Sequence, residues 1–313
     1  MPILQSLAEE AMNNHKFSIK TRAAVRRALL LVNPHARHGQ EMLSQAIRQL
    51  QALGVELLAE SMPSPQHLPD LIRRYRRQVD AVIIGGGDGT LNAAVEGLVD
   101  AQVPLGILPL GTANDLARTL GIPPSLSVAC EIIATGIVRR IDLGWVNGKY
   151  FFNVASLGLS VEITQKLTKT RKRRWGVLAY AITALQAIWQ ARPINAEIRL
   201  NNRSIRVKTI QIAVGNGRHY GGGMTVVHDA TIDDDRLDLY SLEIRHWWQL
   251  LALLPAMRHG RHATLPGVRA LHGQDIQVYT RKPLPINTDG EITTYTPARF
   301  CVIPKALPVL VPS

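Results

Sequence analysis

Cysteine, aromatic residues and acidic charge are all scarce in this 313-residue chain. The two cysteines, Cys130 and Cys301, have no CxxC spacing, which excludes a disulfide scaffold and a cysteine-rich zinc site and fits a reducing compartment. None of the ten histidines forms an HExxH pattern. Because 36 Lys and Arg face only 24 Asp and Glu, the net charge is +12, which favours an anionic partner such as nucleic acid, a nucleotide or an anionic membrane surface.

Long hydrophobic runs are also missing. No stretch reaches the 18 or more apolar residues of a membrane-spanning helix, and polar residues interrupt the longest candidate, 176–191. The first twenty residues lack the apolar core of a signal peptide, so we expect a cytoplasmic protein. The composition, 46% hydrophobic and 19% charged, is that of a globular protein, and the length suggests about two domains.

Candidate buried strands alternate with helical stretches in the first part of the chain. Short apolar runs at 28–33, 80–86 and 104–110 predict strands that are covered on both faces, with a further strand near 55–60. Helices are predicted between them, at about 39–53, in the arginine-rich segment before residue 78, at 90–100 and at 114–121. This alternation predicts a three-layer α/β domain with a parallel sheet.

The second half is predicted to be mainly antiparallel β. Residues 196–200 and 203–216, joined by Asn201-Asn202, have the pattern of a hairpin, and 236–244, 275–280 and 298–304 are further strand candidates. A helical insert at about 174–191 interrupts this half. We therefore expect an extension at 1–22, an α/β domain at 23–142 and a β-rich domain at 143–296, with the segment at about 297–313 able to return to the α/β domain.

A glycine-rich turn, Gly85 to Thr90, joins a predicted buried strand to a predicted helix. Glycines permit close backbone approach by a ligand, and the start of a helix offers unpaired N–H groups and the positive end of the dipole, which suit phosphate. Open α/β sheets bind ligands at this end of their strands. Since GxxxxGK[ST] and GxGxxG are both absent, backbone amides and hydroxyls would have to hold the phosphate. The alternative is a plain tight turn.

Two further strand ends have a similar character. Residues 110–115 repeat the strand, turn and helix design, and there Thr112 or Asn114 could simply cap the helix that follows. Asn33-Pro34 ends the first predicted strand. Three strand ends that converge at one edge of a sheet predict a nucleotide site.

The ordered set of motifs resembles the diacylglycerol kinase catalytic family, in its bacterial lipid kinase (YegS-like) branch, over roughly residues 27–310. The GGDGT part is shared with sphingosine kinases and NAD kinases. The resemblance implies an ATP-binding α/β domain of the NAD kinase and diacylglycerol kinase type, followed by a β-sandwich lipid-substrate domain. The motifs that carry it are VNP at 32–34, GGGDGTLN at 85–92, PLGTAND at 109–115, GNGRHYGGGM at 215–224, DDDRLDL at 233–239 and DGE at 289–291.

The resemblance also implies site residues. Glu291 would accept the proton of the attacking hydroxyl, with Asp289 close by to assist metal or substrate, although a DG pair is also a common hairpin turn. In the acidic loop, Asp234 would bind Mg²⁺ together with backbone oxygens near Thr231 and Arg236, and a solvated turn is the alternative. The implied contacts with ATP are Asn33, Pro34, Ser61, Gly86, Gly87, Asp88, Gly89, Thr90, Leu91 and Thr112.

The sequence departs from the family pattern at three places. Ala36-Arg37 stands where the family often has Ser-Gly, His228 replaces a common Pro, and Asp235 replaces the usual Gly of the acidic loop. The last of these replacements bears on the backbone shape of the metal loop.

A basic cluster precedes the helical insert. Six cations lie between Lys166 and Arg174, and Trp175 and an amphipathic stretch follow. Such a segment suits an anionic membrane interface, and we expect peripheral contact at the inner membrane face through Lys166–Trp175. The alternative is a solvated basic loop before a core helix.

These observations favour a lipid kinase that uses ATP and Mg²⁺ to phosphorylate a hydroxyl of diacylglycerol, phosphatidylglycerol or a sphingoid base. An NAD kinase-like enzyme that acts on a soluble dinucleotide is one alternative, motivated by GGDGT. A basic nucleic-acid-binding protein without catalysis is another, but no nucleic-acid-binding motif accompanies the charge, so we expect no nucleic acid partner. A homodimer is compatible with the sequence.

Overall fold

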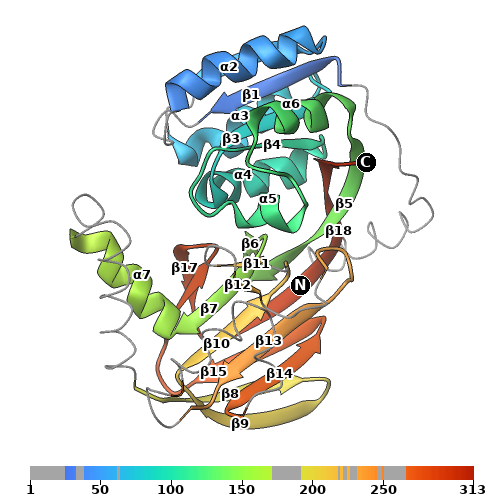
Figure 1. Cartoon of the computed structure of the whole chain (residues 1–313). Coiled ribbons are helices and arrows are strands. Elements are labelled where there is room, and N and C mark those ends of the chain that lie inside the picture. Colours follow the sequence, from blue (N-terminus) through green and yellow to red (C-terminus); the bar gives the residue numbers. More distant parts are fainter. Residues whose placement is uncertain are drawn as a thin grey trace. The chain divides into compact units, whose positions relative to one another are not determined.

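The computed structural model describes residues 25–32, 39–61, 64–170, 192–217, 219–220, 224–225, 231–244, 249 and 266–313 (Figure 1). The chain divides into two compact units. The first unit comprises residues 1–143 and 303–313, and the second comprises residues 144–302.

Parallel strands in the order β2-β1-β3-β4 form the sheet of the first unit. All six residues of β3 and all five of β4 are buried, as their continuous apolar sequences predict. The last part of β18 extends the sheet by pairing in parallel with β4, at Val309 and Leu105. The strands are β1 (Arg27–Val32), β2 (Glu56–Ser61), β3 (Ala81–Gly86), β4 (Leu105–Pro109) and β18 (Ala298–Val311).

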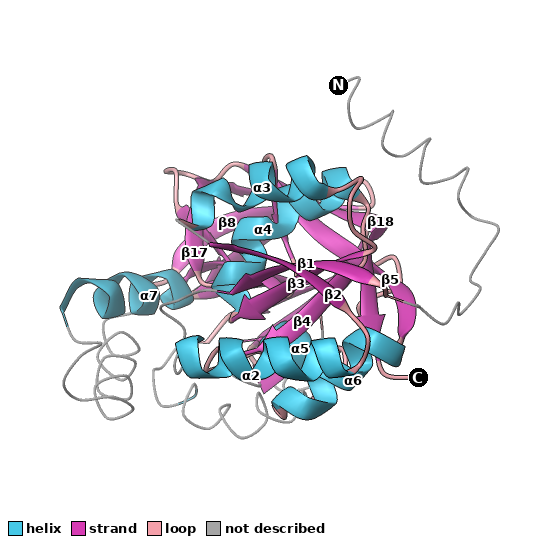
Figure 2. Cartoon of the chain, turned by 90° about the horizontal axis from the view of Figure 1, so that it is seen from above, coloured by secondary structure: helices cyan, strands magenta, loops and turns pink. Residues whose placement is uncertain are grey.

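Helices cover both faces of this sheet. Figure 2 shows α3 and α4 on one side and α2, α5 and α6 on the other, which makes three layers. The helix α4 can lie close to α3 because Gly97 has no side chain, and a Cβ there would lie 2.5 Å from the Cα of Pro69. The helices are α2 (Gly39–Ala52), α3 (Leu68–Tyr75), α4 (Asp88–Ala101), α5 (Asp115–Thr119) and α6 (Leu126–Thr135), with a 3₁₀ turn at Pro65–His67.

Two sheets enclose the core of the second unit. One is antiparallel in the order β14-β13-β10-β7-β16-β17, and the other contains β9, β8, β15 and the first part of β18. Apolar side chains from both sheets, including Leu157, Ile212, Ile276 and Phe300, form one buried cluster, so this unit is a β-sandwich. Its strands are β7 (Val154–Gly158), β8 (Ile194–Leu200), β9 (Arg203–Thr209), β10 (Gln211–Gly215), β13 (Leu237–Leu242), β14 (Val268–Gly273), β15 (Asp275–Thr280), β16 (Pro285–Thr288) and β17 (Glu291–Tyr295).

The remaining elements are short or connect these sheets. A hairpin of β5 (Ile137–Val146) and β6 (Lys149–Phe151) continues the chain out of the first unit, and α7 (Leu159–Thr170) follows β7. The strands β11 (His219–Tyr220) and β12 (Met224–Thr225) pair with each other. No helix in the described part of the chain is long and apolar enough to cross a membrane.

The α/β and β-sandwich architecture confirms the predicted fold class, but one predicted strand was wrong in extent. Residues 203–216 are two strands, because β9 pairs with β8 whereas β10 belongs to the other sheet, between β7 and β13. The change of sheet occurs at Ile210, where the buried hydroxyl of Thr209 donates to the carbonyl of Leu242 at 2.9 Å. An apolar run does not reveal such a change, since both segments face the same core.

Candidate functional site

The carboxyl ends of β1, β2, β3 and β4 lie at one edge of the parallel sheet, as the sequence predicted. Val32 is level with Ser61 on one side and with Gly85 on the other, and Gly86 is level with Pro109. Ser61 therefore ends its strand beside the glycine turn, although its side chain is not among the described ones. Asn33 and Pro34 lie outside the described residues.

The glycine-rich turn leaves the start of α4 open. Gly87 precedes the helix, and its carbonyl accepts the N–H groups of Thr90 at 2.9 Å and Leu91 at 3.2 Å. The helix itself offers no acceptor for the N–H groups of Asp88 and Gly89. A Cβ built on Gly89 meets no atom within 4 Å, so open space lies over this end of the helix. Unpaired amides, the positive dipole end and free space together fit a phosphate group.

The two strand-end turns lie against each other, backbone to backbone. The N–H of Leu110 donates to the carbonyl of Gly86 at 3.0 Å. A Cβ on Gly111 would lie 2.4 Å from the Cα of Gly87, closer than side-chain carbons come to backbone atoms. A Cβ on Gly86 would similarly lie 2.6 Å from the hydroxyl oxygen of the buried Thr90. Gly111 is therefore required by the close approach of the two turns, and Gly86 by the close approach of the first helical turn.

The Asp88 carboxylate connects the first turn to the second. It accepts the backbone N–H groups of Asp115 at 3.1 Å and Leu116 at 3.0 Å, and so caps α5 from 27 and 28 residues away. Because the Asp88 carboxylate already accepts these two hydrogen bonds, the backbone N–H is the group of Asp88 that is left to bind a ligand.

Asn114 and Thr112 do not cap α5 as the alternative reading of the second turn expected. Asn114 has a positive φ of 50° and makes no side-chain capping bond. Its carboxamide instead accepts the N–H of Gly111 at 2.9 Å and donates to the carbonyls of Pro109 and Gly111. Thr112 is exposed on the same turn. This alternative does not hold, because Asp88 accepts the N–H groups at the start of α5, which no local pattern could indicate.

In the second unit, the other motifs meet at one edge of the antiparallel sheet. Gly215, at the end of β10, is level with Val154 at the start of β7 and with Asp238 near the start of β13. Thr288, at the end of β16, is level with Ala155. The acidic loop before β13 and the DGE turn after β16 therefore project from the same edge.

Asp289 holds the start of β7 in place. Its carboxylate accepts three consecutive backbone N–H groups, those of Phe152 at 2.6 Å, Asn153 at 2.9 Å and Val154 at 3.0 Å. With Gly290 it also forms the two-residue turn of the β16–β17 hairpin, and both residues have positive φ. The carboxylate therefore fixes the position of the β7 start relative to the turn, and its expected assistance to metal or substrate stays a prediction.

Glu291 lies two residues further on, at the start of β17. It is exposed, and its side chain makes no hydrogen bond or ion pair with any residue that the structure describes. A carboxylate held on a rigid hairpin and open to solvent can accept a proton from an alcohol that binds beside it.

The structure shows the backbone conformation of the acidic loop, which the sequence did not settle. Asp235 adopts a positive φ of 56°, the conformation that the family's usual glycine would favour. The Oδ2 atom of Asp234 accepts the N–H of Thr231 at 3.4 Å and lies 3.7 Å from the guanidinium of Arg236. Carboxylate and carbonyl oxygens suit a hard cation. Among the described residues, no group of three or more His, Cys, Asp or Glu side chains could hold a metal, so backbone oxygens would have to supply the other ligands.

The predicted membrane segment is only partly visible. The described part ends with α7 at Thr170, and the side chains of Lys166 and Lys169 are not among the described ones. Residues 171–191, with the rest of the basic cluster and Trp175, lie outside the described residues.

Comparison with known proteins assigns both halves of the chain. Residues 27–146 match the diacylglycerol kinase catalytic domain, and residues 153–311 match the YegS C-terminal NAD kinase beta sandwich-like domain. The chain belongs to the bacterial diacylglycerol kinase and YegS-like lipid kinase family. The suspected resemblance is thereby confirmed.

Relatives from several bacteria align over most of their length. A diacylglycerol kinase of Mycobacterium tuberculosis is 31% identical over 90% of this chain and 94% of its own. One of Bacillus subtilis is 27% identical over 92% and 97%. A crystal structure of a diacylglycerol kinase from Bacillus anthracis has a TM-score of 0.72 at 21% identity, covering 92% of this chain and 98% of that one, and so supports the fold.

Proposed function

We propose that this protein is a lipid kinase that uses ATP and Mg²⁺ to phosphorylate a hydroxyl of diacylglycerol, phosphatidylglycerol or a sphingoid base. The observation that carries the proposal is the open start of α4 at Gly89, in a chain whose two halves both match domains of lipid kinases. The turn at the start of α4 supports ATP as the phosphate donor, and the family supports a lipid as the phosphate acceptor.

The first unit would bind the nucleotide. The N–H groups of Asp88 and Gly89 would donate to phosphate oxygens, in a turn that needs no reorganisation because Gly87 and Gly111 hold it rigidly. No P-loop lysine takes part. The other contacts that the resemblance implies, at Asn33, Pro34, Ser61 and Thr112, remain proposals. Bound Mg²⁺ would supply neutralisation of charge on the transferred phosphoryl group.

The second unit would activate the acceptor. A carboxylate oxygen of Glu291 would take the proton of the lipid hydroxyl as that hydroxyl attacks the phosphoryl group. Asp289 would keep the β16–β17 turn and the start of β7 in fixed relation, so that Glu291 has one position. In the acidic loop, Asp234 and the backbone oxygens of Thr231 and Arg236 would hold a second, structural Mg²⁺.

The test is transfer of labelled phosphate from ATP to lipids in neutral detergent micelles, with a panel of the three lipid classes. Glu291→Gln should lower kcat by roughly 100-fold or more while leaving the melting temperature unchanged, since general bases contribute about that much. Glu131→Gln, on the exposed face of α6, is the matched control and should be fully active. A Glu291→Gln enzyme as active as the wild type would refute the assigned role.

Two further measurements separate the alternatives. Phosphate transfer to NAD without any transfer to lipids would establish a dinucleotide kinase. Steeply salt-dependent DNA binding with no ATP turnover would establish a nucleic-acid-binding protein. For its location, we propose peripheral contact with the cytoplasmic face of the inner membrane through Lys166–Trp175.

A further inference from the structure

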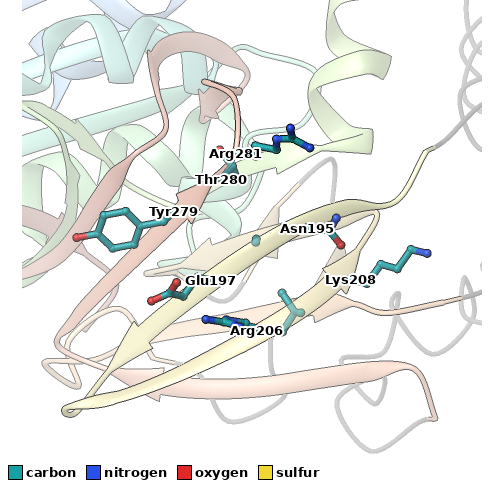
Figure 3. A pocket seen from close by; sticks show the side chains of 9 residues that line it. Asn195, Glu197, Arg206, Lys208, Tyr279, Thr280 and Arg281 are labelled. Carbon is teal, nitrogen blue, oxygen red and sulfur yellow. The ribbon is translucent and has the colours of Figure 1, made fainter.

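An open pocket of about 540 Å³ lies on the outer face of the sheet formed by β9, β8 and β15. The strands alternate, so that Ala196, Ile198 and Val207 face the core while the residues between them face outward. Figure 3 shows the outward side chains around the pocket. Its lining residues are Asn195, Ala196, Glu197, Arg206, Val207, Lys208, Tyr279, Thr280 and Arg281.

Positive charge is in excess around this pocket. Arg206, Lys208 and Arg281 are exposed, and none forms an ion pair with a carboxylate in the described part of the chain. Arg206 and Lys208 lie on β9, whereas Arg281 follows the end of β15, and β8 lies between these two strands. Because neighbouring strands lie about 4.8 Å apart, the three cations occupy a stretch of the sheet about two strand spacings wide.

The one carboxylate in the lining does not cancel this charge. Glu197 accepts hydrogen bonds from Arg199 at 2.7 Å and from Ser204 at 2.9 Å. The Arg199 bond is the main reason why the pKa of Glu197 is lowered, with Ser204 next. Arg206, which is level with Glu197 on the neighbouring strand, also lowers this pKa, so the carboxylate is shared between Arg199 and Arg206. The lining therefore keeps an excess of positive charge, in which Lys208 and Arg281 have the larger part.

An aromatic side chain completes the pocket. The guanidinium carbon of Arg199 lies 4.5 Å from the ring centre of Tyr279, whose hydroxyl donates to Gln277 at 2.9 Å. A ring with an apolar body and a polar tip, beside cations, suits the boundary between lipid headgroups and water.

We propose that this pocket, defined by Arg206, Lys208 and Arg281, binds the phosphate groups of anionic lipids and docks the protein on a bilayer. The choice of a bilayer rests on the proposed function, because a lipid kinase must work at a membrane. It also rests on charge complementarity over an exposed sheet face, where each cation can reach a different headgroup. The surface belongs to a different sheet from the one that carries Asp289 and Glu291.

The test is co-sedimentation of the whole protein with vesicles of phosphatidylcholine alone or mixed equally with phosphatidylglycerol. The triple variant Arg206→Ser, Lys208→Ser and Arg281→Ser should bind mixed vesicles about 100-fold more weakly, from a factor of about five for each cation near an anionic surface. The control triple variant, Arg48→Ser, Arg76→Ser and Arg77→Ser, removes the same charge from exposed positions of the first unit and should bind normally.

Each outcome decides between explanations. Equal binding of mixed vesicles by the pocket variant and the wild type would overturn the proposal, as would an equal loss in both triple variants, which would mean that only total charge matters. If the pocket variant loses affinity for a DNA duplex but keeps its affinity for vesicles, the pocket serves nucleic acid and the proposal fails.

The vesicle assay needs no catalysis, so its result is independent of the proposed function. Kinase activity on lipid in neutral detergent micelles should be the same in the pocket variant as in the wild type. Absence of lipid phosphorylation by the wild type would refute the kinase, whereas unchanged vesicle binding by the variant would refute only the docking surface. Matching melting temperatures of both triple variants exclude misfolding as the cause.

Discussion

Gly87 and Gly111 lie in backbone contact, although they belong to different strand-end turns of the α/β unit. This contact, with the cap that Asp88 gives to α5, makes the two turns one rigid structure. The proposed phosphate site therefore depends on a pair of glycines as well as on the motif that contains it.

Gly111→Ala should disrupt this structure. The added methyl group would lie 2.4 Å from the Cα of Gly87, and because the obstacle is backbone, the turns must separate. We expect the free energy of unfolding to fall by about 1–3 kcal/mol, the usual effect of overpacking. Urea denaturation measures it, and an unchanged midpoint would show that the turns are not held as tightly as the contact indicates.

Gly89→Ala should have the opposite effect on stability: it should weaken ATP binding without destabilising the fold. Its methyl group meets no protein atom within 4 Å, so the fold should be unaffected or slightly more stable, since alanine favours helix. The methyl group would, however, occupy the space proposed for phosphate. We expect the Kd for ATP to rise about tenfold or more, equivalent to losing one hydrogen bond to a charged group. Calorimetric titration with ATP would contradict the site if the affinity were unchanged.

Asp289→Ala should destabilise the protein as well as inactivate it. Removing the carboxylate leaves the N–H groups of Phe152, Asn153 and Val154 without their acceptor, at a cost of roughly 2–4 kcal/mol. Glu291→Gln, in contrast, should reduce kcat alone. Thermal melts of the two variants side by side provide the comparison, and a stable Asp289→Ala protein would argue for a direct chemical role instead.

Substitutions at Asp235 should follow its backbone conformation. Its φ of 56° is accessible to glycine at no cost, so Asp235→Gly should change the unfolding free energy by less than about 1 kcal/mol. Asp235→Val should lose more, because a β-branched residue is strained there. Equal stability of the two variants would mean that the loop relaxes to another conformation.

The two thiols should be unreactive in the folded protein. Burial raises the pKa of Cys130 from 9.0 to about 11, and burial together with Asp275 raises that of Cys301 to about 11. At pH 8 both are protonated, so a disulfide reagent should react far more slowly than after denaturation. Because the unfolded chain ionises first, unfolding becomes more favourable as the pH rises from 9 to 11. Rapid labelling of native protein would contradict this.

Much of the fold follows from short-range patterns in the sequence. Apolar runs predicted β1, β3 and β4 to within a residue or two, and Asn201-Asn202 predicted the β8–β9 hairpin, where both residues have positive φ. The same local patterns placed the glycine turn between a strand and a helix. These features depend on neighbouring residues, which is why the sequence reveals them.

The roles of two acidic residues did not follow from the sequence. Asp88 caps a helix 27 residues away, and Asp289 binds backbone groups 135 to 137 residues earlier. A motif shows that a carboxylate is present but not which backbone amides it meets, because that depends on how the strands are ordered. The exposed cations of β9 form no recognisable run either, since alternation along a strand separates them by intervening residues.

The strand β18 has a consequence for biosynthesis. Its last residues, including the fully buried Leu307, Val309 and Leu310, complete the sheet beside β4. During translation the edge of β4 stays exposed until β18 has left the ribosome, so the sheet of the α/β unit is completed only after the β-sandwich has been synthesised. Chains interrupted before residue 303 would carry an open apolar edge and become targets for chaperones or proteases.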